Sequence, residues 1–284
     1  MNDKSGAELL ECLDSPSEAL GWSSCGGLVS RDITTMRSSK EQIVDPLAST
    51  SDLNMASKRK YGPESSDFGK AVTAKAVEFA CEALISCENQ LNTMDSGAGD
   101  SDCGSTLRRG AEKLLEVIKT KGAANVLYHL SVTFGTIADI AEKIMGGSSG
   151  AMYSIFFESA SATLEKADCV TLSSLSEALD EGLANMRKYG RAAPGDRTMV
   201  DALYPALEVL RESRNSATEN DYLAIFEKAT EAAETGAMKT VKMKASAGRA
   251  SYVAHSELKY PDPGAHAIGI IMRAVFEGYK IKSN

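Results

Sequence analysis

The spacing of apolar residues after Ser66 is that of helices. One series follows Gly104-Ser105 and comprises Leu107, Ala111, Leu114, Leu115 and Ile118. Another follows Gly195-Asp196 and comprises Met199, Ala202, Leu203, Ala206, Leu207 and Leu210. Both repeat at about 3.6 residues, the period of one helix face. Alternation with a period of two, which marks strands, is scarce, so the pattern predicts an all-α fold.

Glycine-rich and polar breaks divide this part of the chain into eight periodic stretches. They cover residues 67–94, 105–121, 124–145, 149–166, 172–189, 197–213, 220–243 and 263–279. Several reach about 20 residues, or about 30 Å of helix. Long helices joined by short loops pack antiparallel, so we expect an eight-helix up-and-down bundle or barrel over residues 66–282.

Residues 1–65 have a different composition, rich in serine, glycine and other polar residues. Segments such as GWSSCGG and TMRSSKE are typical of flexible linkers. We therefore expect a short helical stub at residues 7–13, followed by a largely disordered linker that precedes the helical domain.

Charge and cysteine content exclude several classes of function. The net charge of −8 and a pI near 5.1 disfavour nucleic-acid binding, because no cluster of lysine and arginine offsets the acidic surface. No apolar run is long enough for a membrane span, and the N-terminus lacks a signal-peptide pattern. Six scattered cysteines without a CxxC pair indicate reduced thiols and a cytoplasmic protein.

Candidate chemistry is concentrated in a turn between the first two expected helices. Asp95, Asp100 and Asp102 fall within eight residues, interleaved with glycines. Crowded carboxylates repel one another unless a cation binds, and Mg²⁺ prefers such oxygens together with substrate phosphates. The turn also opens a helix, whose free N–H groups suit a phosphate. An acidic, solvated turn in which Asp102 or Ser105 caps the helix is the alternative.

Three further turns are candidates for anion binding. Residues 146–150, GGSSG, offer hydroxyl groups and free N–H groups, although a tight interhelical turn would have the same sequence. Residues 190–199 and 248–264 are polar, and Arg249 is either a phosphate partner or a surface arginine. Alternate loops of an up-and-down bundle lie at the same end, so all four turns are predicted to converge.

The motifs GDSDCGSTLRRG, MGGSSGA, PGDRTMVDAL and GRASY…DPGA together resemble the nucleotide-binding L domain of dihydroxyacetone kinases. The resemblance covers about residues 66–282 and implies an eight-helix antiparallel barrel that binds ATP or ADP through Mg²⁺. It assigns metal binding to Asp95, Asp100 and Asp102. It assigns nucleotide contacts to Cys103, Gly104, Ser105, Thr106, Ser148, Ser149, Gly190, Thr198, Met199, Arg249, Asp262, Pro263 and Gly264, with Arg249 also catalytic.

One position departs from the family pattern, which is usually GDGD. Here the sequence is Gly99-Asp100-Ser101-Asp102. If that position requires φ > 0, Ser101 costs about 1 kcal/mol of strain and could weaken metal binding.

The resemblance also implies a partner domain. ATP-dependent members carry an N-terminal K domain whose histidine holds the hydroxyketone, and residues 8–22 look like the tail of such a domain. None of the three histidines lies in a matching context, so a kinase acting on dihydroxyacetone or 3,4-dihydroxy-2-butanone would need that domain. Two alternatives stay open: FAD-AMP lyase activity that forms cyclic FMN at the same site, and an ADP-binding regulatory adaptor. A homodimer is compatible with the family, although the sequence carries no interface signal.

Overall fold

The computed structural model describes residues 61–283, in which every regular element is a helix. The eight long helices are α2 (Asp67–Ser86), α4 (Cys103–Lys121), α6 (Leu130–Ile140), α7 (Gly147–Leu164), α8 (Leu172–Gly190), α9 (Val200–Ser213), α10 (Tyr222–Lys239) and α11 (Pro263–Ser283). Two shorter helices are α3 (Glu88–Asp95) and α5 (Ala123–Leu127). The expected all-α fold is confirmed.

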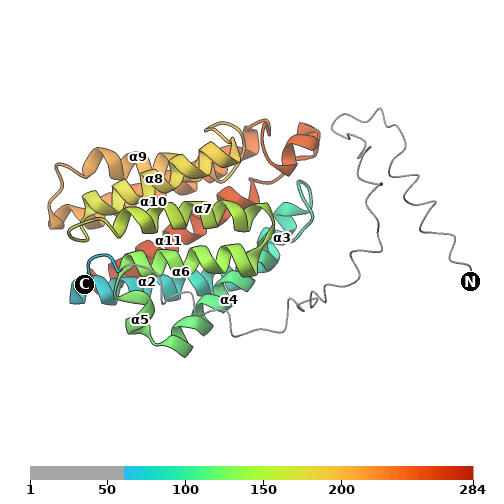
Figure 1. Cartoon of the computed structure of the whole chain (residues 1–284). Helices are drawn as coiled ribbons and strands as arrows, with labels where there is room; N and C mark the ends of the chain where they lie inside the picture. The colour runs from blue at the N-terminus through green and yellow to red at the C-terminus, as the bar shows by residue number, and fades with distance from the viewer. Residues whose placement is uncertain (1–60, 284) are drawn as a thin grey trace, which may run out of the picture. The chain divides into compact units, whose positions relative to one another are not determined.

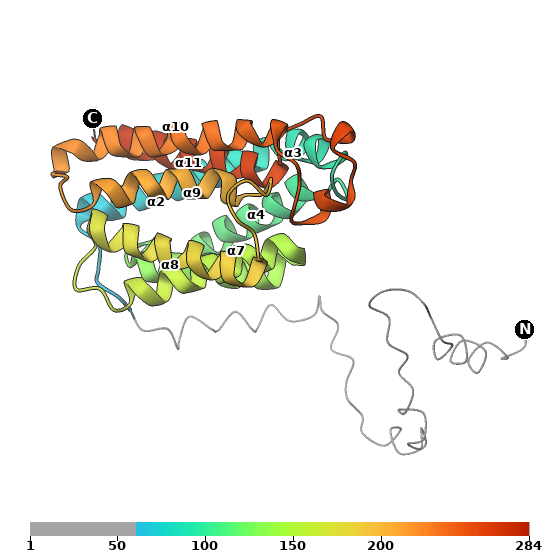
Figure 2. The same cartoon turned by 90° about the horizontal axis from the view of Figure 1, so that it is seen from above.

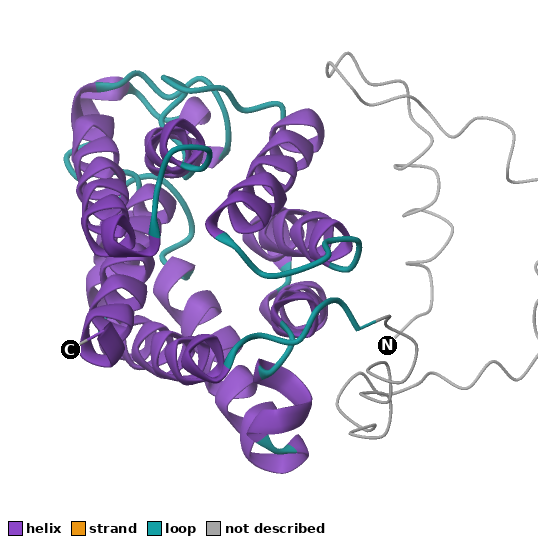
Figure 3. Ribbon diagram, turned by 90° about the vertical axis from the view of Figure 1, so that its left-hand side faces the viewer, coloured by secondary structure: helices purple, strands orange, loops and turns teal. Residues whose placement is uncertain are grey.

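The long helices form a closed ring. Each packs against the next one along the chain, and α11 packs against α2 (Figures 1 and 3). Five short helical turns join them: a π turn at Ala141–Met145 and 3₁₀ turns at Glu219–Asp221, Thr240–Lys242, Arg249–Tyr252 and His255–Glu257. This is the antiparallel arrangement predicted from the eight periodic stretches, with two of those stretches subdivided.

The first subdivided stretch, expected at residues 67–94, changes direction at Cys87. Cys87 has φ −90° and ψ 5°, outside the helical range. Its N–H still donates to the carbonyl of Ala83 at 3.0 Å, and its carbonyl accepts from Leu91 at 3.0 Å. The hydrogen bonding therefore continues through a bend, and α3 carries Asp95 in a new direction at its end.

The second subdivided stretch, expected at residues 124–145, is interrupted at His129, whose backbone is extended. The chain before α2 pairs with this point. Ser65 donates from its backbone N–H to the carbonyl of Tyr128 at 2.9 Å, and Glu64 forms an isolated antiparallel bridge with His129. Residues 61–65, the end of the segment expected to be a largely disordered linker, thus pack on the helical domain, whereas residues 1–60 of that segment lie outside the described residues.

The interior of the ring is apolar, and side chains from all eight long helices surround a cavity of about 360 Å³. Close helix contacts need small residues at a few points. A Cβ on Gly236 of α10 would lie 2.1 Å from the carbonyl oxygen of Asp201 on α9, so only glycine allows this approach. Among the described residues, no helix is long and apolar enough to span a membrane.

Candidate metal and nucleotide site

The three aspartates predicted to bind metal lie together. Asp95 ends α3, and Asp100 and Asp102 lie on the turn before α4. One carboxylate oxygen from each falls within 4.8 Å of the others. Octahedral ligands at 2.0–2.1 Å from Mg²⁺ are separated by about 3–4 Å, so small side-chain rotations would bring these oxygens into one coordination shell. The donor set fits a hard divalent cation.

The three carboxylates differ in environment. Asp95 is buried, and its Oδ2 accepts hydrogen bonds from the backbone N–H groups of Asp102 at 3.0 Å and Cys103 at 3.2 Å. Asp100 is exposed and forms an ion pair with Arg249, whose hydrogen bond lowers the pKa of Asp100. Desolvation, followed by its interaction with Asp100, raises the pKa of Asp102. Charge repulsion within the turn is therefore only partly relieved by the protein itself.

Ser101 adopts φ 63°, the left-handed conformation that the glycine of the family pattern would accept without strain. The strain was predicted only if this position has φ > 0, and it does. Ser101 is exposed and lies between Asp100 and Asp102 in the sequence of the turn.

The start of α4 is capped by side chains of α3. The Oδ1 atom of Asn92 accepts from the N–H groups of Gly104 at 2.7 Å and Ser105 at 3.1 Å. The Ser105 hydroxyl donates to Glu88 at 2.8 Å and accepts from the Asn92 amide at 2.9 Å. Together with the two N–H groups bound by Asp95, the first four donors of this helix are used within the protein.

This capping defines what residues 103–106 do in the structure. They fix α3 to α4, and therefore fix Asp95 relative to Asp102. Burial raises the pKa of the Cys103 thiol to about 12, which favours the protonated thiol. The Thr106 hydroxyl accepts a hydrogen bond from Arg109 at 3.1 Å. Direct contact between residues 103–106 and a phosphate stays a prediction.

The turn before α7 has the opposite character. Gly146 and Gly147 have φ 67° and 61°, and α7 begins without a side-chain cap. Ser148 is exposed and Ser149 is half-buried. The N–H groups at the start of α7 therefore have no side-chain cap, and anion binding there stays a prediction.

Arg109 links α4 to this glycine turn, and the sequence did not predict that role. From α4 its Nη2 donates to the carbonyl oxygen of Met145 at 3.1 Å, directly before Gly146. Arg109 is exposed and lies six residues after Cys103 in α4. No feature of the sequence distinguishes it from the other surface arginines.

The third turn, residues 190–199, is held by Asp201 of α9. This buried carboxylate accepts from the N–H groups of Gly195 at 2.5 Å and Thr198 at 2.8 Å. Gly190 ends α8 and lies against Met152 of α7. Met199 lies against Gly264, because a Cβ on that glycine would be 3.6 Å from the Met199 Cβ.

The fourth turn leads into α11, where Pro263 is buried. Asp262 caps this helix through Oδ2, which accepts from the N–H of Ala265 at 2.8 Å. Burial raises the pKa of Asp262 to about 6, although Arg197 lies 3.9 Å away. Asp95 also raises the pKa of Asp262, so the first and fourth turns are electrostatically coupled.

The predicted convergence is confirmed for the first, third and fourth turns. Ala98 of the aspartate turn packs with Ala245, Ala250 and Leu258, all from the segment before α11. Ser246 of that segment donates to the Asp196 carbonyl of the third turn at 3.1 Å. Figure 2 shows α3, the start of α4 and this segment at the same end of the ring.

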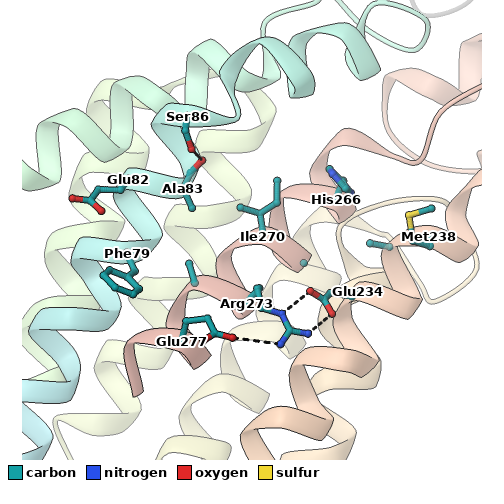
Figure 4. Close-up of a pocket in the computed structure, with 13 residues that line it drawn as sticks. Phe79, Glu82, Ala83, Ser86, Glu234, Met238, His266, Ile270, Arg273 and Glu277 are labelled. Carbon is teal, nitrogen blue, oxygen red and sulfur yellow. Dashed lines mark hydrogen bonds and ion pairs between the residues drawn. The ribbon is translucent and has the colours of Figure 1, made fainter. Parts of the chain in front are cut away.

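A separate groove of about 780 Å³ lies between α2, α10 and α11 (Figure 4). Arg273 crosses it and forms ion pairs with Glu234 and Glu277. None of the three aspartates lines this groove, which therefore lies outside the candidate site.

Comparisons with known proteins agree with this geometry. The family described as the DAK2 domain matches residues 97–277. Triokinase/FMN cyclase from Homo sapiens is 37% identical over 276 residues, which are 95% of this chain and 43% of that protein. Dihydroxyacetone kinase from Pichia angusta is 34% identical over 299 residues, which are 98% of this chain and 44% of that protein.

A solved structure is also similar. It is the dihydroxyacetone kinase of C. freundii in complex with AMP-PNP and Mg²⁺, with a TM-score of 0.59 and 32% sequence identity. The match covers 78% of this chain and 35% of that one.

The helical ring with its acidic turn thus defines the class, an all-α DAK2 domain. The chain belongs to the dihydroxyacetone kinase family. It spans less than half the length of these curated relatives.

Proposed function

We propose that this chain is the nucleotide-binding part of an ATP-dependent kinase that phosphorylates a small hydroxyketone such as dihydroxyacetone or 3,4-dihydroxy-2-butanone. The observation that carries the proposal is the grouping of one carboxylate oxygen from each of three aspartates within 4.8 Å of one another. The Mg²⁺ and AMP-PNP bound by the similar kinase from C. freundii support the assignment of Mg²⁺ and ATP.

Each part of the site has a distinct task in this proposal. Asp95, Asp100 and Asp102 would hold Mg²⁺, which supplies positive charge against the phosphates. The N–H groups and hydroxyls at Ser148 and Ser149 would bind phosphate oxygens. Arg249 would add a second positive charge once the nucleotide is bound, and residues around Thr198, Met199 and Gly264 would contact the rest of the nucleotide.

The acceptor is proposed to lie on a second, K-type domain. The carboxylates, N–H groups and arginines of the described site suit the phosphoryl donor, and His129 lies at the other end of the ring, against Gly62. In-line transfer then requires that the acceptor hydroxyl be presented to the γ-phosphate from outside this domain. Because the chain covers only part of its relatives, binding of the nucleotide rather than turnover is the property to test first.

Titration calorimetry with Mg-ADP tests the site directly. Asp100→Asn combined with Asp102→Asn should weaken binding by at least tenfold, because two anionic ligands are lost. Glu64→Gln combined with Asp67→Asn is the matched control, since it removes the same charge beside Lys70 at the start of α2. Equal affinity of the site variant and the wild type would overturn the assignment.

A second candidate activity is FAD-AMP lyase, which the name Triokinase/FMN cyclase of the human relative supports. Incubation with FAD and Mg²⁺, followed by chromatography for cyclic FMN, distinguishes it from the kinase. Cyclic product that disappears in the Asp100 and Asp102 variant would place both activities at one site.

A further inference from the structure

Arg197 is an unusual residue at the base of the third turn. It is the largest side chain among the fully buried ones in the described residues, with 2% of its surface exposed. Its backbone is left-handed, with φ 64°. A buried guanidinium and a left-handed non-glycine backbone are each unfavourable, so their combination requires surroundings that hold Arg197 in place.

Most of the hydrogen-bonding capacity of Arg197 is unused. Its Nη2 donates to the carbonyl oxygen of Tyr260 at 2.8 Å. Its Nε and Nη1 have no hydrogen-bond partner in the described part of the chain, and Nη1 stays 3.9 Å from Asp262. The one strong contact therefore links the third turn to the segment that precedes α11.

That segment, residues 243–262, is here called the closing segment, and it carries Arg249. Two adjacent residues of the third turn hold its two ends. The Asp196 carbonyl accepts from Ser246 near the start, and Arg197 donates to Tyr260 near the end. Between these anchors, the closing segment contributes short 3₁₀ turns and the ion pair of Arg249 with Asp100.

We propose that Arg197 is a positioning residue that clamps the closing segment and thereby holds Arg249 over the aspartate turn. The inference rests on the proposed function only in its consequence, which is that the clamp supports nucleotide binding through Arg249. The clamp itself is a statement about contacts between residues 196–197 and 243–262.

The choice of residue type supports a positioning role over simple packing. A methionine or leucine would fill the same buried volume without desolvating a charge. Only a long cationic donor both reaches across from the third turn and makes a charge-assisted bond to a backbone carbonyl. Asp262 faces the guanidinium and compensates part of its charge without forming a hydrogen bond.

Hydrogen–deuterium exchange of the full chain tests the clamp without any ligand. In Arg197→Met, amides of residues 243–262 should exchange on the order of tenfold faster, because one charge-assisted hydrogen bond is lost. Arg197→Lys, which keeps a cationic donor, should restore part of the protection. Arg211→Met is the matched control, since it removes an arginine that is paired with Asp180 on the surface of α9.

Mg-ADP titration then tests the consequence. Arg197→Met should weaken binding several-fold, and the double variant with Arg249→Met should bind no more weakly than Arg249→Met alone. Additive losses would show that Arg197 does not act through Arg249. Absence of Mg-ADP binding by the wild type would overturn the proposed function, while the exchange comparison would still decide the clamp.

Unchanged exchange of the closing segment in Arg197→Met would overturn the clamp, and so would a uniform acceleration across all helices. If that variant does not fold, native-state exchange of the wild type in low urea replaces it. The clamp requires residues 191–199 and 243–262 to open together and before the long helices. Independent opening of the two segments would refute it.

Discussion

Replacement of Ser101 by glycine should stabilise the protein, and the structure sets the size of the effect. A left-handed residue with a Cβ costs about 1–2 kcal/mol, and Ser101 has φ 63°. Glycine also gives the unfolded chain more freedom, which offsets about 0.4–1 kcal/mol. The difference leaves a net gain of about 0.8 kcal/mol. For a domain of this size that raises the Tm by roughly 2–3 °C.

Differential scanning calorimetry in EDTA measures this shift without a metal ion. Arg191→Gly is the matched control for stability, because Arg191 is also left-handed, with φ 53°, and is the C-cap of α8 instead of a residue of the aspartate turn. Both variants should gain similar stability. In Mg-ADP titrations neither variant should change the affinity by more than about twofold. The strain at Ser101 is already present in the protein without ligand, so its removal should affect the free and the bound protein equally.

Two results would refute this reasoning. A Ser101→Gly protein with the same or a lower Tm, beside a stabilised Arg191→Gly protein, would show that the turn does not hold φ near 63° in solution. An affinity gain of about fourfold without a change in Tm would show that the cation imposes the strained conformation. In that case the strain would oppose metal binding instead of folding.

Three further tests, which use four substitutions, probe separate parts of the site. Burial raises the pKa of Asp262 from 3.8 to about 6. Between these two pH values the folded protein keeps a proton on Asp262 that the unfolded chain has lost, so the free energy of unfolding falls as the pH rises from 3.8 to about 6. Asp262→Asn should therefore flatten the stability profile between those pH values and stabilise the protein at pH 7 by up to roughly 3 kcal/mol, as urea unfolding across pH would show. Arg109→Met should weaken Mg-ADP binding on the order of tenfold in calorimetric titrations, because the turn before α7 loses its tie to α4; unchanged affinity would separate this arginine from the site. A Cβ on Gly104 would lie 2.1 Å from the backbone oxygen of Glu88, whereas one on Gly97 would meet its nearest atom at 3.5 Å. Gly104→Ala should thus cost about 1–3 kcal/mol in urea unfolding and Gly97→Ala should be nearly neutral, so equal effects would contradict the close packing of α3 on α4.

The helices could be predicted because apolar periodicity reflects burial of one face, and that face is buried in almost any bundle. The bend at Cys87 and the break at His129 left no comparable pattern. The break depends on pairing of Glu64 and Ser65 with residues 128–129, a contact across more than 60 positions. Local periodicity carries no information on such long-range competition for backbone hydrogen bonds.

In the candidate site, too, the sequence predicted what topology determines and did not predict individual long-range contacts. Alternating loop order alone placed the four turns at one end, since topology fixes which loops share an end. Arg109 and Arg197 were not predicted, because their importance lies in single hydrogen bonds to the carbonyls of Met145 and Tyr260. A carbonyl has no sequence signature, so arginines that bind main-chain oxygens look like any other surface or core arginine.

The two helix starts in the site show why capping decides where a phosphate can bind. By sequence, α4 and α7 each follow a glycine-rich turn and each offer free donors. In the structure Asp95 and Asn92 accept from the N–H groups of Asp102 to Ser105 at the start of α4, so a phosphate there would have to displace Asp95 or Asn92. The start of α7 has no side-chain cap. It is connected to α4 by the hydrogen bond from Arg109 to the carbonyl oxygen of Met145. In the proposed function, α4 would therefore fix the carboxylates that bind the cation, and α7 would provide the N–H donors for the phosphate that accompanies it.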